Sequence, residues 1–206
     1  MGDRDHCCSL VTVVLSLSLC LPIPSLAHAE EMAVQIPVGT QTLGITAGPF
    51  FPIRLTEEQS TKLFGGATGL STSFTLTDPL GSGWYRGQVS LGAELIGFFT
   101  SEPSGSYGIG LSPKLGYTFI GAQRFRPYLE GGGGPMWTDL GGRVPEQSSQ
   151  FNFLVWAGAG CSYLVTPQWA VTAGYRFMHI SNAGLSEPNS GLNFGLPYVG
   201  LQYSLF

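Results

Sequence analysis

Apolar and polar residues alternate along most of this 206-residue chain. Between Tyr85 and Phe99 the odd positions carry aromatic, aliphatic or glycine residues, whereas the even positions include Arg86 and Glu94. The segment 107–119 repeats the pattern. A period of two predicts β-strands, because successive side chains of a strand point to opposite faces. No segment shows the period of a long amphipathic helix.

Eight segments with this alternation follow one another along the chain. They are 41–50, 69–77, 84–99, 106–120, 125–134, 151–164, 168–181 and 194–206. Short gaps between them alternate with mostly longer ones, as in outer-membrane barrels, where short turns lie in the periplasm and long loops lie outside. The pattern predicts a periplasmic start and an outward-running strand at 168–181.

The chain is poor in charge rather than rich in apolar residues. Charged residues make up 11% of it and hydrophobic residues 43%, whereas an ordinary soluble domain is roughly 25% charged. So few charges cannot coat a water-exposed barrel. We therefore predict an all-β fold, an eight-stranded antiparallel transmembrane β-barrel with its apolar face toward lipid. The residues assigned to its lumen are Arg86, Glu94, Lys114, Arg126, Glu130 and Arg176.

The first 29 residues have the composition of a secretory signal peptide. An apolar run over 9–21 is too short to span a bilayer, and the small-x-small site Ala27-His28-Ala29 follows it. Cleavage there predicts a signal peptide over 1–29 and one barrel domain over 30–206.

Removal of the signal peptide limits the chemistry that remains. His179 and Cys161 are then the one histidine and the one cysteine that remain. A multi-histidine metal site and an internal disulfide are therefore excluded. We expect no metal and no cofactor. The net charge of −4 and the scatter of Lys and Arg exclude a nucleic-acid-binding face.

One pair of residues carries reactive chemistry. His179 and Ser181 are two positions apart at the outer end of a predicted strand, so both face lipid with Cβ atoms roughly 6.5–7 Å apart. A serine hydroxyl needs a base to become a nucleophile, and an imidazole is such a base. A His-x-Ser spacing is common by chance, but polar groups on a lipid-facing wall indicate a function.

The segment from His179 to Asn193, His-Ile-Ser-Asn-Ala-Gly-Leu-Ser-Glu-Pro-Asn-Ser-Gly-Leu-Asn, resembles the C-terminal motif of the lipid A 3-O-deacylases, the PagL family. The resemblance implies a serine esterase of the bacterial outer membrane that removes the 3-O-linked hydroxyacyl chain of lipid A. It implies lipid A and membrane lipid as partners. It also implies Ser181 as nucleophile, His179 as general base, and Asn182 and Gly184 as oxyanion ligands.

The third catalytic position departs from the family pattern. Members of the family have glutamate where this chain has Asn193. Asparagine can orient an imidazole but cannot offset its positive charge. Glu187 in the same loop is a substitute carboxylate, and we place Asn193 ahead of it. The departure also leaves open a non-catalytic outer-membrane barrel with a structural or adhesive role.

Overall fold

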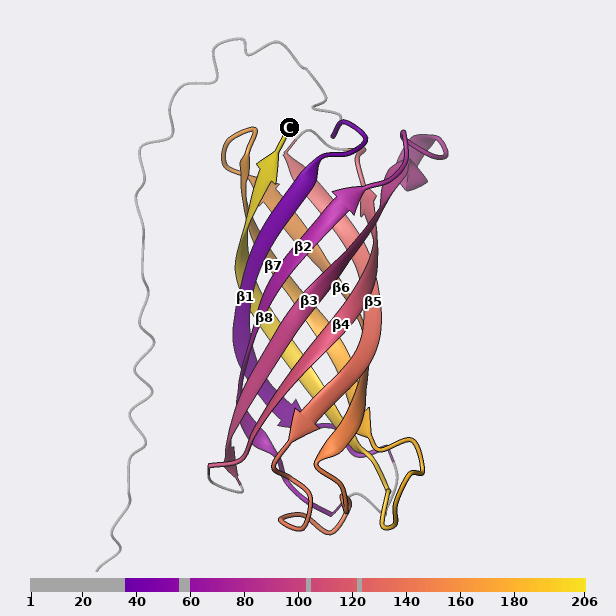
Figure 1. Cartoon of the computed structure of the whole chain (residues 1–206). Helices are drawn as coiled ribbons and strands as arrows, with labels where there is room; N and C mark the ends of the chain where they lie inside the picture. The colour runs from indigo at the N-terminus through magenta and orange to yellow at the C-terminus, as the bar shows by residue number, and fades with distance from the viewer. Residues whose placement is uncertain (1–35, 56–59, 103–104, 122–123) are drawn as a thin grey trace, which may run out of the picture. The chain divides into compact units, whose positions relative to one another are not determined.

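The chain folds into a closed antiparallel barrel of eight strands (Figure 1). The computed structural model describes residues 36–55, 60–102, 105–121 and 124–206. Its strands are β1 (Gln41–Pro52), β2 (Phe64–Thr75), β3 (Gly87–Glu102), β4 (Tyr107–Phe119), β5 (Phe125–Thr138), β6 (Phe151–Leu164), β7 (Trp169–Ser181) and β8 (Leu192–Leu205). The predicted fold class is confirmed. The predicted signal peptide lies outside the described residues and stays a prediction.

Each strand pairs with the next, and β1 pairs with β8, so every strand has two hydrogen-bonded neighbours. The alternation in the sequence sets which residues face outward: the odd-numbered positions in β1 and β3 to β8, and the even-numbered positions in β2. The outward side chains are largely apolar, and many are 40–60% exposed, such as Leu70, Leu115 and Val155. We call the end that carries the long connections 53–63, 139–150 and 182–191 the loop end, and the opposite end the turn end.

Ion pairs fill the middle of the lumen. The Arg176 guanidinium donates to both carboxylate oxygens of Glu94, at 2.6 and 3.1 Å, and its Nε donates to Glu130 at 2.9 Å. Lys114 pairs with Glu130 at 3.1 Å and with Glu94 at 3.6 Å. Two cations thus meet two anions. The guanidinium of Arg176 also lies over the rings of Trp156 and Tyr198. The network stabilises the buried charges because each has an opposite charge beside it.

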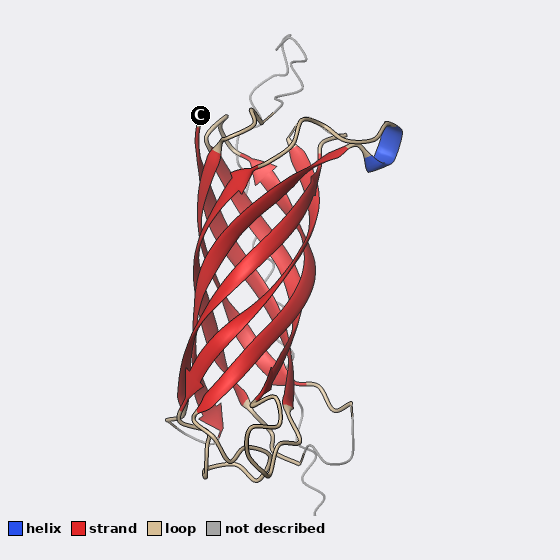
Figure 2. Cartoon of the chain, turned by 45° about the vertical axis from the view of Figure 1, so that its right-hand side comes forward, coloured by secondary structure: helices blue, strands red, loops and turns tan. Residues whose placement is uncertain are grey.

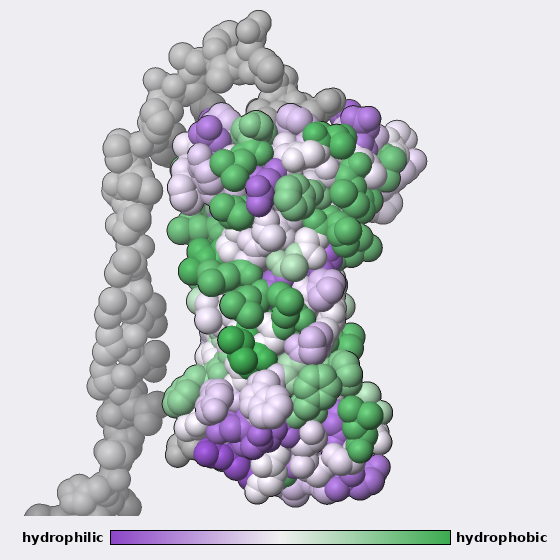
Figure 3. Space-filling view, in the orientation of Figure 1, coloured by the Kyte–Doolittle hydropathy of each residue, from purple (hydrophilic) through white to green (hydrophobic). Residues whose placement is uncertain are grey.

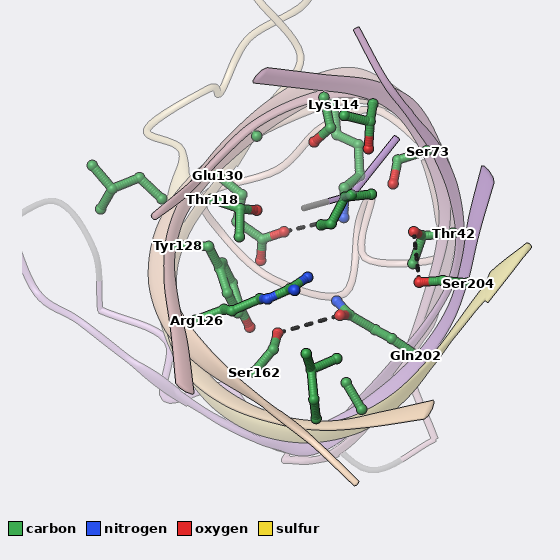
Figure 4. A pocket seen from close by; sticks show the side chains of 17 residues that line it. Thr42, Ser73, Lys114, Thr118, Arg126, Tyr128, Glu130, Ser162, Gln202 and Ser204 are labelled. Carbon is green, nitrogen blue, oxygen red and sulfur yellow. Dashed lines mark hydrogen bonds and ion pairs between the residues drawn. The ribbon is translucent and has the colours of Figure 1, made fainter. Parts of the chain in front are cut away.

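The lumen differs on the two sides of this network. Toward the loop end it is packed with apolar side chains, among them Phe50, Phe194, Met178 and Ile180. Toward the turn end it holds a polar cavity of about 90 Å³ (Figure 4). Side chains that line the cavity include Thr42, Ser73, Lys114, Arg126, Ser162 and Gln202.

Two details of the sequence prediction are wrong. Arg86 is not in the lumen but in the connection before β3, where Gly81 and Gly83 adopt positive φ angles of 75° and 59° and a 3₁₀ turn spans Gly83–Tyr85. This turn projects sideways from the barrel (Figure 2), with Trp84 at its tip 83% exposed. In addition, β2 begins at Phe64 rather than at 69. The glycines in its first half adopt strand geometry, but they show no alternation of apolar and polar side chains from which the strand could be predicted.

The charge network yields the first prediction. Replacing Arg176 by leucine leaves Glu94 and Glu130 short of a partner in the lumen, and we expect the free energy of unfolding to fall by about 3–5 kcal/mol. Urea titration of the protein folded in lipid vesicles measures this. Arg143→Leu is the control, because Arg143 is 51% exposed and its ion pair with Asp139 lies at the surface; its effect should stay below about 1 kcal/mol. If the two variants lower the free energy of unfolding equally, the charge network contributes no more stability than a surface ion pair.

Candidate active site

The sequence-predicted pair lies at the loop end of β7, on the outer face. His179 and Ser181 are half-buried, whereas the residues between and before them, Ile180 and Met178, are buried in the lumen. On the neighbouring strand β6, Phe153 pairs with Ser181. His179 and Ser181 therefore face the lipid side of the barrel, and the apolar Phe153 lies beside Ser181.

The imidazole is held from β8. His179 and Asn193 are register partners, and Nδ1 of His179 lies 2.8 Å from Oδ1 of Asn193. An amide oxygen only accepts hydrogen bonds, so this contact places the proton on Nδ1. The lone pair of Nε2 is then available to accept a proton, as a general base must.

Gly191, the residue just before β8, limits where the imidazole ring of His179 can lie. A Cβ added to Gly191 would be 2.6 Å from Cε1 and 3.3 Å from Nε2 of His179, so the imidazole occupies the space that a side chain there would need. The φ of Gly191 is +69°, which also favours glycine. The Cε1–Nε2 side of the ring therefore faces Gly191.

Asn182 and Gly184 lie inside the loop that follows β7. The Asn182 side chain is fully buried; its Oδ1 accepts the Gly184 N–H at 2.9 Å, and its Nδ2 donates to the Ser186 carbonyl at 2.7 Å. Its own N–H donates to Oδ1 of Asn189 at 2.9 Å. In this conformation both residues shape the loop, and the Gly184 N–H is already bonded to Asn182.

Glu187 is exposed in the same loop. Within the described part of the chain, the side chain brought to Nδ1 of His179 is therefore that of Asn193, with Glu187 on the loop surface. The structure thus joins His179 to Asn193, with Ser181 two positions along the same face of β7, and leaves Glu187 on the loop surface.

Sequence reasoning missed the neighbouring loop 139–150, which supports the site. Its Gln147 donates from Nε2 to the Ile180 carbonyl at 3.3 Å, between the two reactive residues. Its Ser148 N–H donates to the Pro188 carbonyl at 3.2 Å. Gly191 could have been noticed as the glycine of Pro-Asn-x-Gly, but no local signal marks Gln147, since its contact spans more than thirty positions.

The same loop contains a buried carboxylate. Glu146 is 1% exposed and accepts hydrogen bonds from the N–H groups of Ser60 and Thr61, both at 2.7 Å, and from the Thr61 hydroxyl at 2.6 Å. Burial by itself raises the pKa of Glu146, but these hydrogen bonds outweigh it and hold the pKa below its ordinary value. Glu146 thereby ties the connection after β1 to the loop beside the site.

In the described residues, no group of three His, Cys, Asp or Glu side chains is arranged to hold a metal ion. The same residues include no helix long and apolar enough to cross a membrane.

A closed eight-stranded barrel with an apolar exterior and a charged lumen defines an outer-membrane β-barrel, here with a histidine–serine pair on its wall. The model of the family described as "Lipid A 3-O-deacylase (PagL)" matches residues 65–202, which include every residue of this site. The chain therefore belongs to the PagL family.

Individual relatives agree with this assignment. The lipid A deacylase PagL of Pseudomonas aeruginosa is 33% identical over 107 residues, which are 51% of this chain and 54% of that protein, so the match spans about half of its length. The crystal structure of the outer membrane enzyme PagL has a TM-score of 0.53 at 19% identity and covers 80% of this chain and 99% of its own. Neisserial surface protein A has a TM-score of 0.59 at 17% identity, covering 81% and 99%. These two likenesses show the barrel fold.

The hydrogen bonds that Glu146 accepts from Ser60 and Thr61 lead to a prediction about the effect of pH on this contact. A carboxylate whose folded-state pKa is lowered stabilises the fold fully above its unfolded value of about 4.3 and loses that effect as the pH falls through the folded value. We expect the amide NMR signals of Ser60 and Thr61 to stay constant from about pH 7 to 5 and to shift below about pH 4. Glu146→Gln cannot titrate and is the control. Signals that move equally in both proteins would assign the change to another group.

Proposed function

We propose that this protein is a lipid A 3-O-deacylase, a serine esterase of the outer membrane that removes the 3-O-linked hydroxyacyl chain of lipid A and so remodels lipopolysaccharide. The observation that carries the proposal is the hydrogen bond between His179 and Asn193 beside Ser181 on the lipid-facing wall. Family membership supports it, because the matched region contains this site.

The chemistry follows from the orientation of the imidazole. Nε2 of His179 takes the proton of the Ser181 hydroxyl while Oγ attacks the ester carbonyl. The tetrahedral intermediate collapses, and the sugar oxygen leaves with the proton from Nε2. Water then attacks the acyl-enzyme, with His179 again as base, and restores Ser181. One ester and one water give one 3-hydroxy fatty acid and one sugar hydroxyl.

Asn193 supports this cycle by geometry rather than by charge. Its Oδ1 keeps the proton on Nδ1 and so keeps Nε2 ready to accept. It offers no negative charge to the imidazolium that forms in each step, so the oxyanion of the intermediate is the charge that balances it. We therefore expect a working but slower site than one with glutamate at this position.

The location of the pair suits an ester of an outer-leaflet lipid. Ser181 is the last residue of β7 at the loop end, which faces the cell exterior in barrels of this class. Phe153 of β6 is its register partner, and Val155, 58% exposed, is the partner of His179. An acyl chain that descends from the ester meets apolar side chains along this wall.

A second candidate is a barrel with a structural or adhesive role and no catalysis. Two observations favour it: asparagine replaces the family's glutamate at position 193, and the Gly184 N–H is already bonded to Asn182. The experiments below separate the two candidates.

The first experiment concerns the third position. Removing the partner that orients a metal-bound histidine typically costs about 10- to 100-fold, and by analogy we expect Asn193→Ala to lower the deacylation rate by a similar factor. Glu187→Ala should leave it within about twofold. Release of 3-hydroxy fatty acid from purified lipid A, followed by mass spectrometry, measures both. If Glu187→Ala lowers the rate more than Asn193→Ala does, Glu187 is the group that orients His179. If neither variant changes the rate, the site is a Ser–His dyad.

The second experiment concerns the nucleophile and base. Ser181→Ala and His179→Ala should each reduce release by at least about a thousandfold, and the double variant should lose little more, because residues that act as one unit are not additive. Ser101→Ala is the control, since Ser101 is an exposed serine at the loop end of β3. A Ser181→Ala protein that deacylates at the wild-type rate rules out the serine esterase. A wild-type protein that releases no fatty acid favours the non-catalytic barrel.

A further inference from the structure

The loops 139–150 and 182–191 pair with each other at the loop end of the barrel. Three backbone contacts join them, an antiparallel pairing and two hydrogen bonds of 3.2 Å: Gln147 with Asn189, the Ser148 N–H to the Pro188 carbonyl, and the Ser190 N–H to the Glu146 carbonyl. We call residues 146–148 and 188–190, which thus run antiparallel, the loop ribbon. Figure 3 shows hydrophilic residues gathered at the loop end, at the bottom of the view.

The loop ribbon contacts β7 between the two reactive residues. Nε2 of Gln147 donates to the carbonyl of Ile180 at 3.3 Å, and Ile180 is the residue between His179 and Ser181. The Gln147 side chain is 1% exposed, so water cannot readily replace this hydrogen bond, and losing it leaves buried polar groups without a partner. Gln147 thereby fixes the stretch of backbone from which both reactive side chains extend.

The same ribbon contacts the chain just before β8. Ser190, which donates to the carbonyl of Glu146, is followed by Gly191. The imidazole of His179 lies against this glycine, because a Cβ added there would be 2.6 Å from Cε1 of the ring. The backbone on both sides of the imidazole is thus attached to two adjacent residues of one loop, and the position of the ring depends on where that loop lies.

The Glu146 carboxylate anchors the loop ribbon to a third connection, the one between β1 and β2. It is buried and accepts four hydrogen bonds, from the N–H and the hydroxyl of both Ser60 and Thr61, at 2.6–3.0 Å. Hydrogen bonds to a charged group are stronger than those between neutral groups. The same connection also contacts β8, because the Ile53 N–H donates to the carbonyl of Asn193 at 2.9 Å. The carboxylate therefore joins the ribbon to a segment that is itself attached beside the site.

Buried apolar side chains also hold these segments at the barrel end. They come from two of the connections and from the first residue of β8: Leu63, Leu140, Val144 and Leu192. Because this packing does not depend on the polar contacts, removing one polar side chain of the ribbon should shift the loop rather than unfold the barrel. A single substitution there can therefore test geometry.

We propose that Gln147 and Glu146 are positioning residues for the imidazole of His179. Gln147 fixes the strand that carries the ring, and Glu146 fixes the loop ribbon that carries Gln147 and holds Gly191 against the ring. The inference rests on the proposed function and adds to it a loop on which the reactivity of the site depends. Both side chains are buried, so they act through His179, whose ring must lie within hydrogen-bond reach of the Ser181 hydroxyl to accept its proton.

The first test removes the contact with β7. Gln147→Ala has a matched control in Gln88→Ala, because Gln88 is 2% exposed and also donates from Nε2 to backbone carbonyls, those of Ile36 and Thr77, but at the turn end. A misplaced reacting group can cost about a hundredfold, so we expect kcat of Gln147→Ala on lipid A to fall about 10- to 100-fold with KM unchanged, and Gln88→Ala to keep both. Heat-modifiable migration on gels checks folding. An equal fall in kcat for the two variants, a fall in neither, or a change in KM alone would overturn the inference.

The second test concerns the anchor. Glu146→Gln keeps the length of the side chain and an acceptor oxygen for the N–H groups of Ser60 and Thr61, which both donate to Oε1. Glu146→Ala removes every one of these contacts. We expect kcat to fall about tenfold in Glu146→Ala and to stay within about threefold of wild type in Glu146→Gln, where at most one hydrogen bond is lost. A glutamine variant as slow as the alanine variant, or an alanine variant as fast as wild type, contradicts a role as anchor.

The imidazole itself gives a readout that needs no substrate. In nitrogen NMR of the protein with isotope-labelled histidine, wild type should show the His179 proton on Nδ1, because Oδ1 of Asn193 only accepts hydrogen bonds; the spectrum of His179→Ala identifies the signals of the other histidines. In Gln147→Ala we expect exchange between the two neutral tautomers, and in Gln88→Ala the wild-type spectrum. A wild-type tautomer in Gln147→Ala would overturn the inference. If the wild-type protein releases no fatty acid, the proposed function fails, and the tautomer measurement alone decides whether the loop positions the ring.

Discussion

The bilayer interior offers no water to a backbone N–H or carbonyl, and this constraint determines the rest of the molecule. A sheet can satisfy all its backbone groups there only by closing on itself, which β1 and β8 accomplish. Closure gives every strand an inner and an outer face. The outer face must be apolar, so the charges in the middle of the strands lie in the lumen, where Arg176 and Lys114 meet Glu94 and Glu130.

The same constraint makes the outward His179, Ser181 and Asn193 informative. Polar groups on the lipid side are unfavourable unless they hydrogen-bond, and the contact between Nδ1 and Oδ1 satisfies two of them at once. A carboxylate in place of Asn193 would be harder to keep charged beside lipid, but it would stabilise the imidazolium. In the proposed mechanism, asparagine therefore gives up the charge that would balance the imidazolium, at a lower cost of desolvation.

The sequence predicted what depends on neighbours along the chain. Strand identities and the facing of His179 and Ser181 follow from the period of two, and all eight predicted strands correspond to strands of the barrel. Arg86 was misplaced because a 3₁₀ turn interrupts the alternation just before β3. The roles of Gln147 and Glu146 depend on loops that meet only after closure, and no local pattern encodes such contacts.

For the proposed deacylase, the substrate is also part of the surrounding lipid, which poses an unusual recognition problem. Lipid surrounds the whole wall, so apolar contact alone cannot distinguish one chain from the next. Near the loop end, the polar row at His179 and Asn193 interrupts the apolar wall. Because a closed barrel fixes the register between strands, it also fixes where His179 and Asn193 lie on the wall, so a lipid with no fixed position of its own meets these polar groups at a defined place.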